Sequence, residues 1–202
     1  MARTTGSNGE ETAKRIDEVA LKLFAQKGYA AVSMREIARE VGVQAGALYN
    51  YSPNKQDLLA RLMVEHMNDL LKAWADLDPN AMAPLDALKA FVLFHIRYHV
   101  QRPDQVFISY MELRNLEPEN FSKVEELRRK YEAALKDILK RGHDQGQFVL
   151  EDVHVTTMAI LAQLTGVTTW YRAKGRLSQQ KIEEIYTQLV CQSVGAQSSE
   201  EI

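Results

Sequence analysis

The chain has 202 residues, of which 46% are hydrophobic, so it can form one large or two small domains with a buried core. No apolar run approaches the roughly 20 residues of a membrane-spanning helix, and the polar start MARTTGSNGE lacks the apolar centre of a signal peptide. The only cysteine, Cys191, excludes an internal disulfide and a zinc site made of several cysteines. We therefore expect a cytoplasmic protein with no membrane contact.

Charge is unevenly distributed along the chain. The net charge of −2 argues against a protein that coats nucleic acid without sequence preference. Residues 1–55 contain eight Lys and Arg against six Asp and Glu, whereas the remainder contains seventeen against twenty-one. A contact with nucleic acid would therefore be favoured in the first part of the chain.

Helical periodicity covers almost the whole sequence, and no segment alternates in the manner of a strand. The first predicted helix, Thr12–Lys27, places Ile16, Leu23 and Phe24 on one face and ends at Gly28. We expect this helix to pack beneath the two short helices that follow it.

The second predicted helix has a full set of local start and stop signals. Ser33 is a preferred N-cap, and Glu36 three positions later completes a capping box. Val32 and Ile37 have the spacing of a hydrophobic staple. Gly42 can adopt the left-handed conformation that ends a helix.

A third, short helix is predicted from Gln44 to about Tyr49, and it opens on the small residues Ala45, Gly46 and Ala47. Two short helices joined by a Gly-centred turn are typical of a helix-turn-helix, which places its second helix in the major groove of DNA. The alternative is a generic helical hairpin with no partner.

Six further helices complete the prediction. The first begins at the cap Asn54 and continues without Gly or Pro to about Ala75, so it joins the short helices to the rest of the chain. The others are expected at Pro84–Gln101, Pro103–Leu116, Glu119–Arg141, Asp152–Ala173 and Ser178–Val194. Gly142 and Gly146 are expected to break the fourth of the six. The fold class is therefore all-α, with a three-helix head and a six-helix bundle.

The residues of the head resemble the TetR family of bacterial transcriptional repressors. The resemblance is carried by SMREIAREVGV at 33–43, GALY at 46–49 and NKQDLL at 54–59, after FAQKG at 24–28. It covers about the first sixty residues, and beyond them only the architecture is similar. It implies a homodimer that binds a palindromic DNA operator and releases it when a small-molecule effector binds. It also implies a DNA-binding domain at 11–55, a ligand-binding and dimerisation domain at 56–197, and no cofactor.

Four residues match positions that contact DNA phosphates in this family: Ser33, Tyr49, Tyr51 and Lys55. Hydroxyl groups, an ammonium group and the first amides of a helix all suit phosphate oxygens. Tyr49 could instead pack inside the head.

Four other residues are expected to lie at the bases. Arg35 can pair in a bidentate manner with guanine, and Gln44 would face the groove at the start of the recognition helix. The methyl group of Ala45 suits thymine, and Gly46 permits close approach. Arg35 could instead be a solvated surface residue, and Ala45 a plain helix former.

One pair of residues departs from the family pattern at the joint before the Asn54 helix. The family usually has a large apolar residue, often Phe, where this chain has Ser52, and Pro53 follows. We expect the ring of Tyr51 to fill that space, which would weaken its role as a phosphate contact.

Aromatic and polar residues on otherwise apolar helices are the candidate effector site. The candidates are Trp74, His99, Phe107, Tyr110, Arg114, Tyr131, Gln163 and Trp170. Most of these side chains could equally be core. His95 and His99, four residues apart, could bind a metal ion, but no acidic or cysteine partner is evident, so no metal is expected.

The segment TTWYRAKGRLS at 168–178 is similar to a segment in the branch of the family that responds to acyl-CoA thioesters. Arg172, Lys174 and Arg176 would suit the phosphates of coenzyme A, although they could also be a solvated helix end. The last two helices are the expected dimer surface, through Ile160, Leu164, Val167, Ile182, Ile185 and Leu189.

The leading hypothesis is a ligand-responsive repressor. The alternative is a helix-turn-helix regulator without a small-molecule effector, controlled by a protein partner. An enzyme is not expected, because the chain has no Glu-x-x-His, no Gly-rich phosphate loop and no nucleophile elbow.

Overall fold

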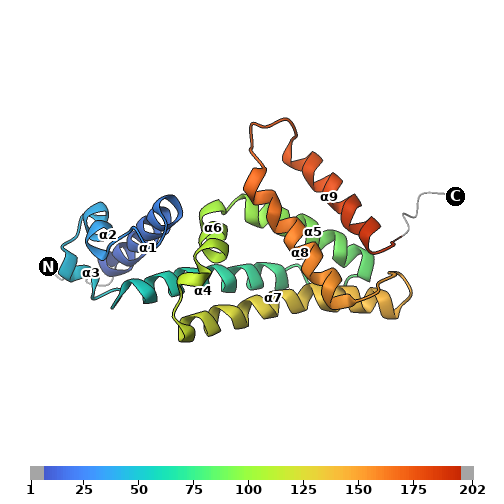
Figure 1. The fold of residues 1–202 in the computed structure, drawn as a ribbon, viewed down its shortest axis with the longest axis horizontal. Coiled ribbons are helices and arrows are strands. Elements are labelled where there is room, and N and C mark those ends of the chain that lie inside the picture. Colours follow the sequence, from blue (N-terminus) through green and yellow to red (C-terminus); the bar gives the residue numbers. More distant parts are fainter. Residues whose placement is uncertain (1–6, 197–202) are drawn as a thin grey trace. The chain divides into compact units, whose positions relative to one another are not determined.

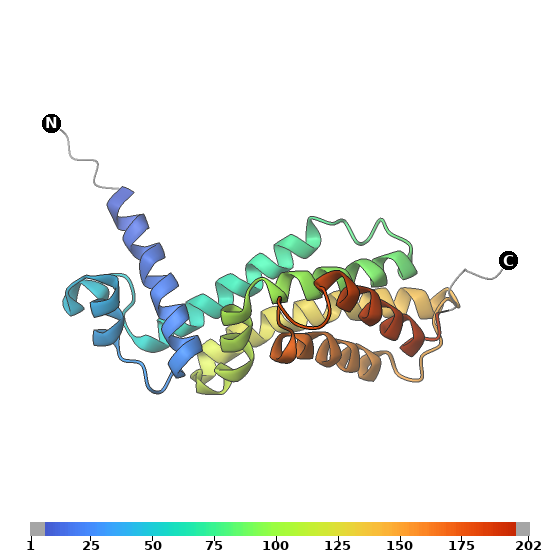
Figure 2. The same cartoon turned by 90° about the horizontal axis from the view of Figure 1, so that it is seen from above.

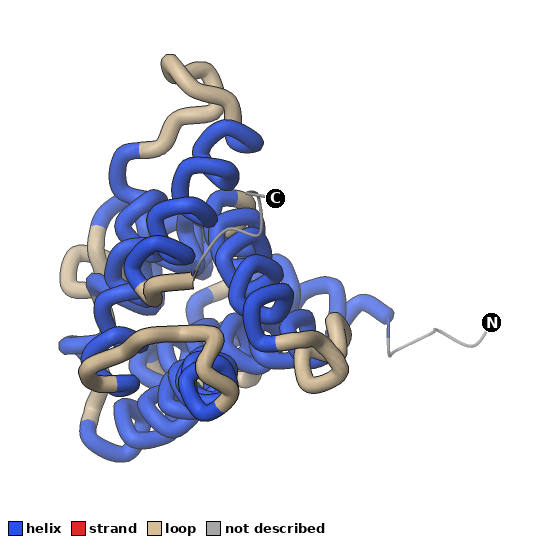
Figure 3. Tube along the Cα trace, turned by 90° about the vertical axis from the view of Figure 1, so that its right-hand side faces the viewer, coloured by secondary structure: helices blue, strands red, loops and turns tan. Residues whose placement is uncertain are grey.

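The computed structural model describes residues 7–196, and these residues form nine α-helices, one short 3-10 helix and no strand (Figures 1 and 3). In chain order the elements are α1 (Ser7–Lys27), α2 (Met34–Val41), α3 (Ala45–Leu48), α4 (Lys55–Ala75), α5 (Pro84–Val100), α6 (Pro103–Met111), η1 (Leu113–Asn115), α7 (Pro118–Asp144), α8 (Val153–Trp170) and α9 (Gln179–Ser193). The predicted all-α fold is confirmed. No helix in the described part is long and apolar enough to cross a membrane.

Side-chain caps fix the starts of four helices. Ser33 Oγ accepts a hydrogen bond from the Glu36 amide at 3.2 Å, and Asn54 Oδ1 accepts one from the Asp57 amide at 2.8 Å. Asp152 and Ser178 cap α8 and α9 in the same way. Each cap satisfies an amide that has no partner within its helix. The predicted caps Ser33 and Asn54 are therefore confirmed. The Glu36 carboxylate, the other member of the predicted capping box, accepts a hydrogen bond from Lys27.

Several predicted boundaries differ from the structure. Helix α1 begins at Ser7 and not at Thr12, and α8 ends at Trp170 and not at about Ala173. The predicted helix Pro103–Leu116 ends at Met111, and the chain then tightens into η1. The predicted break at Gly142 does not occur, because α7 continues through it to Asp144.

Gly142 serves packing and does not end the helix. A Cβ atom at this position would lie 2.1 Å from two carbons of the Phe148 ring, and that ring is 2% exposed. The chain turns back only at Gly146, where φ is +70°. Gly142 therefore admits the Phe148 ring against the end of α7.

The described residues form two compact units. Unit 1 comprises residues 7–68 and 104–127, and unit 2 comprises 69–103 and 128–196. Helices α4 and α7 each contribute residues to both units.

In unit 1, α1 packs on α2 and α2 packs on α3. The core of this unit contains Ile16, Phe24, Ile37 and Leu48 from the first three helices, each fully buried, and it also contains Ile108, Leu116 and Val124 from the α6–α7 region. The staple residues Val32 and Ile37 are both in this core. The head therefore shares its core with residues that are far away in the sequence.

In unit 2, α5 contacts both α8 and α9 (Figure 2). Its core includes Leu88, Phe91 and Val92 of α5 and Leu164 of α8, all fully buried. Apolar residues on several faces of α5 are therefore needed to cover two neighbours at once.

We predict that Gly142→Ala lowers the free energy of unfolding by about 1–3 kcal/mol, because the added methyl group displaces the Phe148 ring. Urea denaturation would measure this change in the free energy of unfolding. Gly9→Ala is the control, since a Cβ there meets nothing within 4 Å. Equal stability of Gly142→Ala and the unmodified protein would contradict this account.

Candidate nucleic-acid interface and effector region

The turn between α2 and α3 depends on Gly42. Its φ of 81° and ψ of 29° are left-handed, and its amide donates to the carbonyls of Ala38 and Arg39. The Val43 amide also reaches the Ala38 carbonyl, at 3.0 Å. These bonds satisfy the last carbonyls of α2 and turn the chain into α3. The two helices thus form the predicted helix-turn-helix.

Five of the eight predicted DNA-contacting residues lie on the exposed surface of the α2–α3 region. They are Ser33, Arg35, Gln44, Gly46 and Tyr49. Tyr49 is 49% exposed, so it does not pack inside the head. A Cβ atom on Gly46 would meet nothing within 4 Å, so the fold itself does not require glycine there. Ala45 is half-buried and packs against the core of unit 1.

Lys55 is bound more tightly to the protein than the sequence suggested. Its Nζ donates to the carbonyl oxygens of Tyr29 and Val32, both at 2.8 Å, and lies 4.1 Å from the centre of the Tyr29 ring. Burial lowers the pKa of this ammonium group. An ammonium group has three hydrogens, so one remains for a phosphate oxygen.

The joint between α3 and α4 is packed without a large residue at position 52. Ser52 is fully buried, and its Oγ has no hydrogen-bond partner among the described residues. Tyr51 is half-buried and packs against the core of unit 1. Arg61 of α4 donates to the Tyr51 carbonyl at 2.9 Å and pairs with Asp17 of α1, so the joint is held to the first helix.

Unit 2 contains a buried polar network around His95. This imidazole is fully buried, with Nδ1 3.2 Å from the Tyr131 hydroxyl and Nε2 3.2 Å from Thr165 Oγ1. The His99 ring stacks on it at 3.8 Å, and His99 Nδ1 lies 2.8 Å from the His95 carbonyl, to which it must donate. Burial, and secondarily the neighbouring His99, lowers the pKa of His95 well below its usual value. His95 is therefore neutral and joins α5 to α7 and α8.

Aromatic contacts extend this network. Trp74 meets Phe91 edge-on at 5.0 Å, and Phe91 stacks on Tyr131 at 5.2 Å. Three predicted effector residues, Trp74, His99 and Tyr131, are therefore buried in one cluster. Among the described residues, no group of three or more His, Cys, Asp and Glu side chains could hold a metal ion.

The other predicted effector residues lie elsewhere. In unit 2, Gln163 is half-buried, and Trp170 is 49% exposed and stacks on Tyr186. Phe107, Tyr110 and Arg114 belong to unit 1 and are exposed. The structure thus does not gather the eight residues into one site.

Sequence reasoning missed a groove of about 550 Å³ between α5 and α9 of unit 2. From α5 it is lined by Leu85, Lys89, Leu93 and Arg97, which recur every four residues. That spacing predicts that the four residues share one face of a helix. It does not predict which helix lies across the groove from them.

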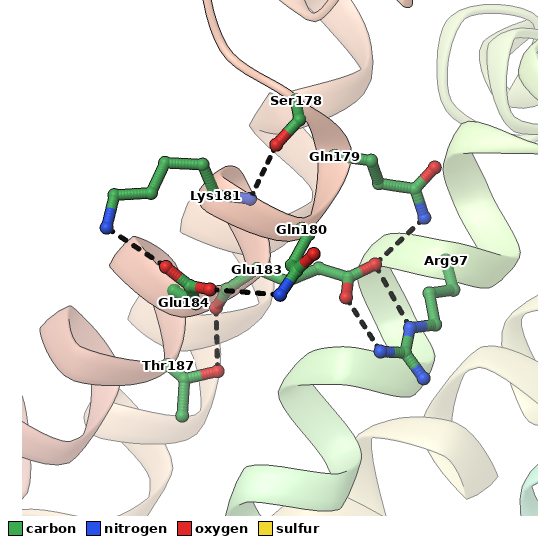
Figure 4. Close-up of polar contacts among 8 residues, drawn as sticks. All are labelled: Arg97, Ser178, Gln179, Gln180, Lys181, Glu183, Glu184 and Thr187. Carbon is green, nitrogen blue, oxygen red and sulfur yellow. Dashed lines mark hydrogen bonds and ion pairs between the residues drawn. The ribbon is translucent and has the colours of Figure 1, made fainter.

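Arg97 and Glu183 both line this groove, and together with Gln179 they form a polar clamp (Figure 4). Arg97 Nε and Nη2 donate to the two carboxylate oxygens of Glu183 at 3.0 and 2.7 Å, and Gln179 donates to Oε1 at 2.8 Å. Burial acts to raise the pKa of Glu183, but these hydrogen bonds outweigh it and the pKa is lowered. The clamp therefore fixes α9 against α5.

The predicted dimer residues need correction. Four of the six, Ile160, Leu164, Val167 and Ile182, are at most 2% exposed, because they pack inside the protomer. The large apolar residues exposed on α8 and α9 are Val155, Met158, Trp170 and Leu189.

Two family models match the chain. Residues 16–62 match that of the bacterial regulatory proteins of the tetR family, and residues 81–194 match a tetracyclin repressor-like C-terminal domain. The chain therefore belongs to the TetR family of transcriptional regulators, which are DNA-binding proteins and not enzymes.

Individual relatives resemble the chain over most of its length. The HTH-type transcriptional repressor KstR2 of Mycobacterium tuberculosis is 25% identical over 175 residues, which cover 86% of this chain and 88% of KstR2. A tetR-family regulatory protein from Rhodococcus RHA1 superposes with a TM-score of 0.87 and 28% identity, covering 93% of this chain and 98% of that one. AibR, crystallised with isovaleryl coenzyme A and operator DNA, shares the fold with a TM-score of 0.81 and 24% identity, covering 88% and 97%.

We predict that the free energy of unfolding falls as the pH is lowered from 7.5 to 5. The unfolded chain protonates His95 near pH 6.5, whereas the folded chain does so only at lower pH, so acid favours unfolding. Urea titrations across this range should give a steeper fall for the unmodified protein than for His95→Gln, by up to about 1.4 kcal/mol per pH unit. His154→Gln, at an exposed position, is the control. Equal slopes for the unmodified protein and His95→Gln would refute the assignment.

Proposed function

We propose that this protein is a ligand-responsive repressor that binds a palindromic operator as a homodimer and is released by an acyl-CoA thioester. The observation that carries the proposal is the exposed face of the helix-turn-helix. Ser33, Arg35, Gln44 and Gly46 remain in solvent there, while the apolar residues of the same helices are buried.

Each exposed residue has a distinct role at the operator. Arg35 reads a guanine, since its guanidinium group can donate two parallel hydrogen bonds to the base edge. Gly46 lets the backbone of α3 approach the bases. Ser33 and Tyr49 bind phosphates and so fix the orientation of α3 in the groove. Lys55 and Tyr51 have a secondary role, because both are already engaged by the head.

The homodimer forms through the exposed apolar residues of α8 and α9. Val155 is 64% exposed, and Met158, Trp170 and Leu189 are each at least 42% exposed. Ala159, Ala162 and Thr169 are exposed on α8 as well, so two such faces can approach closely. A two-fold axis through this surface would present two reading heads to a palindromic operator.

The interior of unit 2 suits an uncharged acyl group better than a carboxylate. Among the described residues no Lys or Arg is buried, and His95, kept neutral by burial, is surrounded by hydroxyl groups and the His99 ring. A thioester carbonyl can accept a hydrogen bond from such a group, whereas a buried carboxylate needs a cation or several donors.

The phosphates of coenzyme A would be bound at the surface. Arg172, Lys174 and Arg176 are all in or next to the connection between α8 and α9, and Arg172 and Lys174 are exposed. A relative of the same fold, AibR, binds isovaleryl coenzyme A, which supports this effector class.

Operator binding tests the head. An operator can be recovered by selection from random DNA, and affinity measured by fluorescence anisotropy at fixed salt. We predict that Arg35→Ala and Tyr49→Ala each weaken binding by about ten-fold or more, with unchanged thermal stability. Lys14→Ala removes an exposed charge from α1 and serves as the control. Full affinity in both variants would exclude this interface.

Thermal unfolding tests the effector. We expect isovaleryl coenzyme A to raise the melting temperature and to release the operator, whereas free coenzyme A does so weakly, because it lacks the acyl group. The double variant Lys174→Ala, Arg176→Ala should lose most of the shift, and Lys123→Ala should keep it. Stabilisation by another chemical class, with none by any acyl chain length, would rule out the thioester. If no small molecule of any class stabilises the protein, control by a protein partner becomes the better explanation.

A further inference from the structure

Tyr29, in the connection between α1 and α2, is hydrogen-bonded to two other segments of unit 1 and packs against a third. Its amide donates to Glu112 Oε1 at 3.2 Å, and its carbonyl accepts from Lys55 Nζ at 2.8 Å. Its hydroxyl accepts from Gln56 Nε2 at 3.0 Å. The ring also packs against Phe24 of α1, with centroids 5.4 Å apart. Every polar group of this residue is therefore used. We call this set of contacts the Tyr29 junction.

The α6–α7 region supplies the other side of the junction. Glu112, between α6 and η1, is 7% exposed and also accepts from the side chain of Asn115. Gln56 uses both ends of its amide, because Nε2 donates to the Asn115 carbonyl and Oε1 accepts from the Glu117 amide at 3.0 Å. Three hydrogen bonds thus connect η1 and its flanks with α4 and with the α1–α2 connection.

The charges at the junction are arranged around one residue. An anion, Glu112, accepts from the Tyr29 amide, and a cation, Lys55, donates to the Tyr29 carbonyl. The 2.8 Å bond from Lys55 has the length of a strong charge-assisted bond, and the 3.2 Å bond to Glu112 is longer. Both are directional, so together they restrict the position of Tyr29 more than apolar contact would.

The position of Glu112 is unfavourable for stability alone. Its Oε1 would lie 3.5 Å from a Cβ on Gly28, where α1 ends, and the carboxyl end of a helix repels an anion. No Lys or Arg pairs with Glu112 among the described residues. An apolar residue would avoid this cost but would deprive the Tyr29 amide and Asn115 of their acceptor, so the direction of these hydrogen bonds points to a positioning role.

We propose that Glu112 and Gln56 are positioning residues that hold the helix-turn-helix in its operator-binding orientation on the α6–α7 region. The proposal rests on the proposed function, because it requires an operator. Helix α7 contributes Val124 to the core of unit 1 and Tyr131 to the buried network of unit 2, so the same helix takes part in both.

The test uses full-length variants and the selected operator. Glu112→Ala and Gln56→Ala should each weaken operator binding by about ten-fold or more. An effect of charge alone would raise the operator affinity of Glu112→Ala, because removing an acidic group reduces repulsion from the DNA phosphates. The slope of log affinity against log salt should stay that of the unmodified protein, because no phosphate contact is lost.

Two matched variants separate position from charge. Glu112→Gln keeps an acceptor for the Tyr29 amide and should retain affinity within about three-fold. Glu119→Ala removes an exposed acid from the start of α7 and should bind as well as the unmodified protein or better. Amide exchange should rise across residues 33–51 in Glu112→Ala and Gln56→Ala, but not in Glu119→Ala.

The outcomes are separable. Unmodified protein that selects no operator refutes the proposed function itself. Unmodified protein that binds, together with Glu112→Ala and Gln56→Ala that bind equally well, refutes the positioning role. If Glu112→Ala does not fold, Gln56→Ala decides: full affinity overturns the proposal, and weakened affinity at an unchanged salt slope supports it.

Discussion

Most buried polar side chains have a hydrogen-bond partner, and in this chain several of those partners lie on other helices and so fix which helices are neighbours. His95 joins α5 to α7 and α8, and Glu183 joins α9 to α5. Glu112 joins the α6–η1 connection to the turn after α1. Apolar contact is not directional, so it would tolerate rotation or sliding of these helices. The paired polar groups select one arrangement, at a cost in desolvation that the hydrogen bonds offset.

The head differs, because its candidate DNA-contacting residues are kept out of such pairs. Arg35, Gln44 and Tyr49 are exposed, while the packing of α2 and α3 relies on Ile37 and Leu48. Lys55 is the intermediate case: it stabilises the α1–α2 turn and still has a hydrogen to donate. A DNA-binding head needs both kinds of group, because unpaired side chains are available to DNA and paired ones hold the helices in position.

The local features were predictable from the sequence, and the long-range pairs were not. Ser33, Asn54 and Gly42 act within four residues of themselves, so their spacing alone predicted two caps and a turn. Tyr29 and Glu112 are 83 positions apart, and Arg97 and Glu183 are 86 apart. No periodicity links such residues. The prediction at Gly142 was wrong because glycine is common where helices end. Here glycine is needed because the ring of Phe148, six residues later, packs against position 142. Ile160 and Leu164 were assigned to the dimer surface because a helical pattern reveals an apolar face but not its partner.

The free energy of a hydrogen bond at the Tyr29 junction is comparable to that of a measurable change in operator affinity. A ten-fold change in operator affinity corresponds to about 1.4 kcal/mol. One hydrogen bond contributes about 0.5–1.5 kcal/mol net, and about 1.5–3 kcal/mol when one partner is charged. If Glu112 has the proposed positioning role, loss of its bond to the Tyr29 amide would change operator affinity measurably without a large change in the fold. An effector need only favour the state without that bond by a comparable free energy, because a ligand shifts an equilibrium by its difference in affinity for the two states.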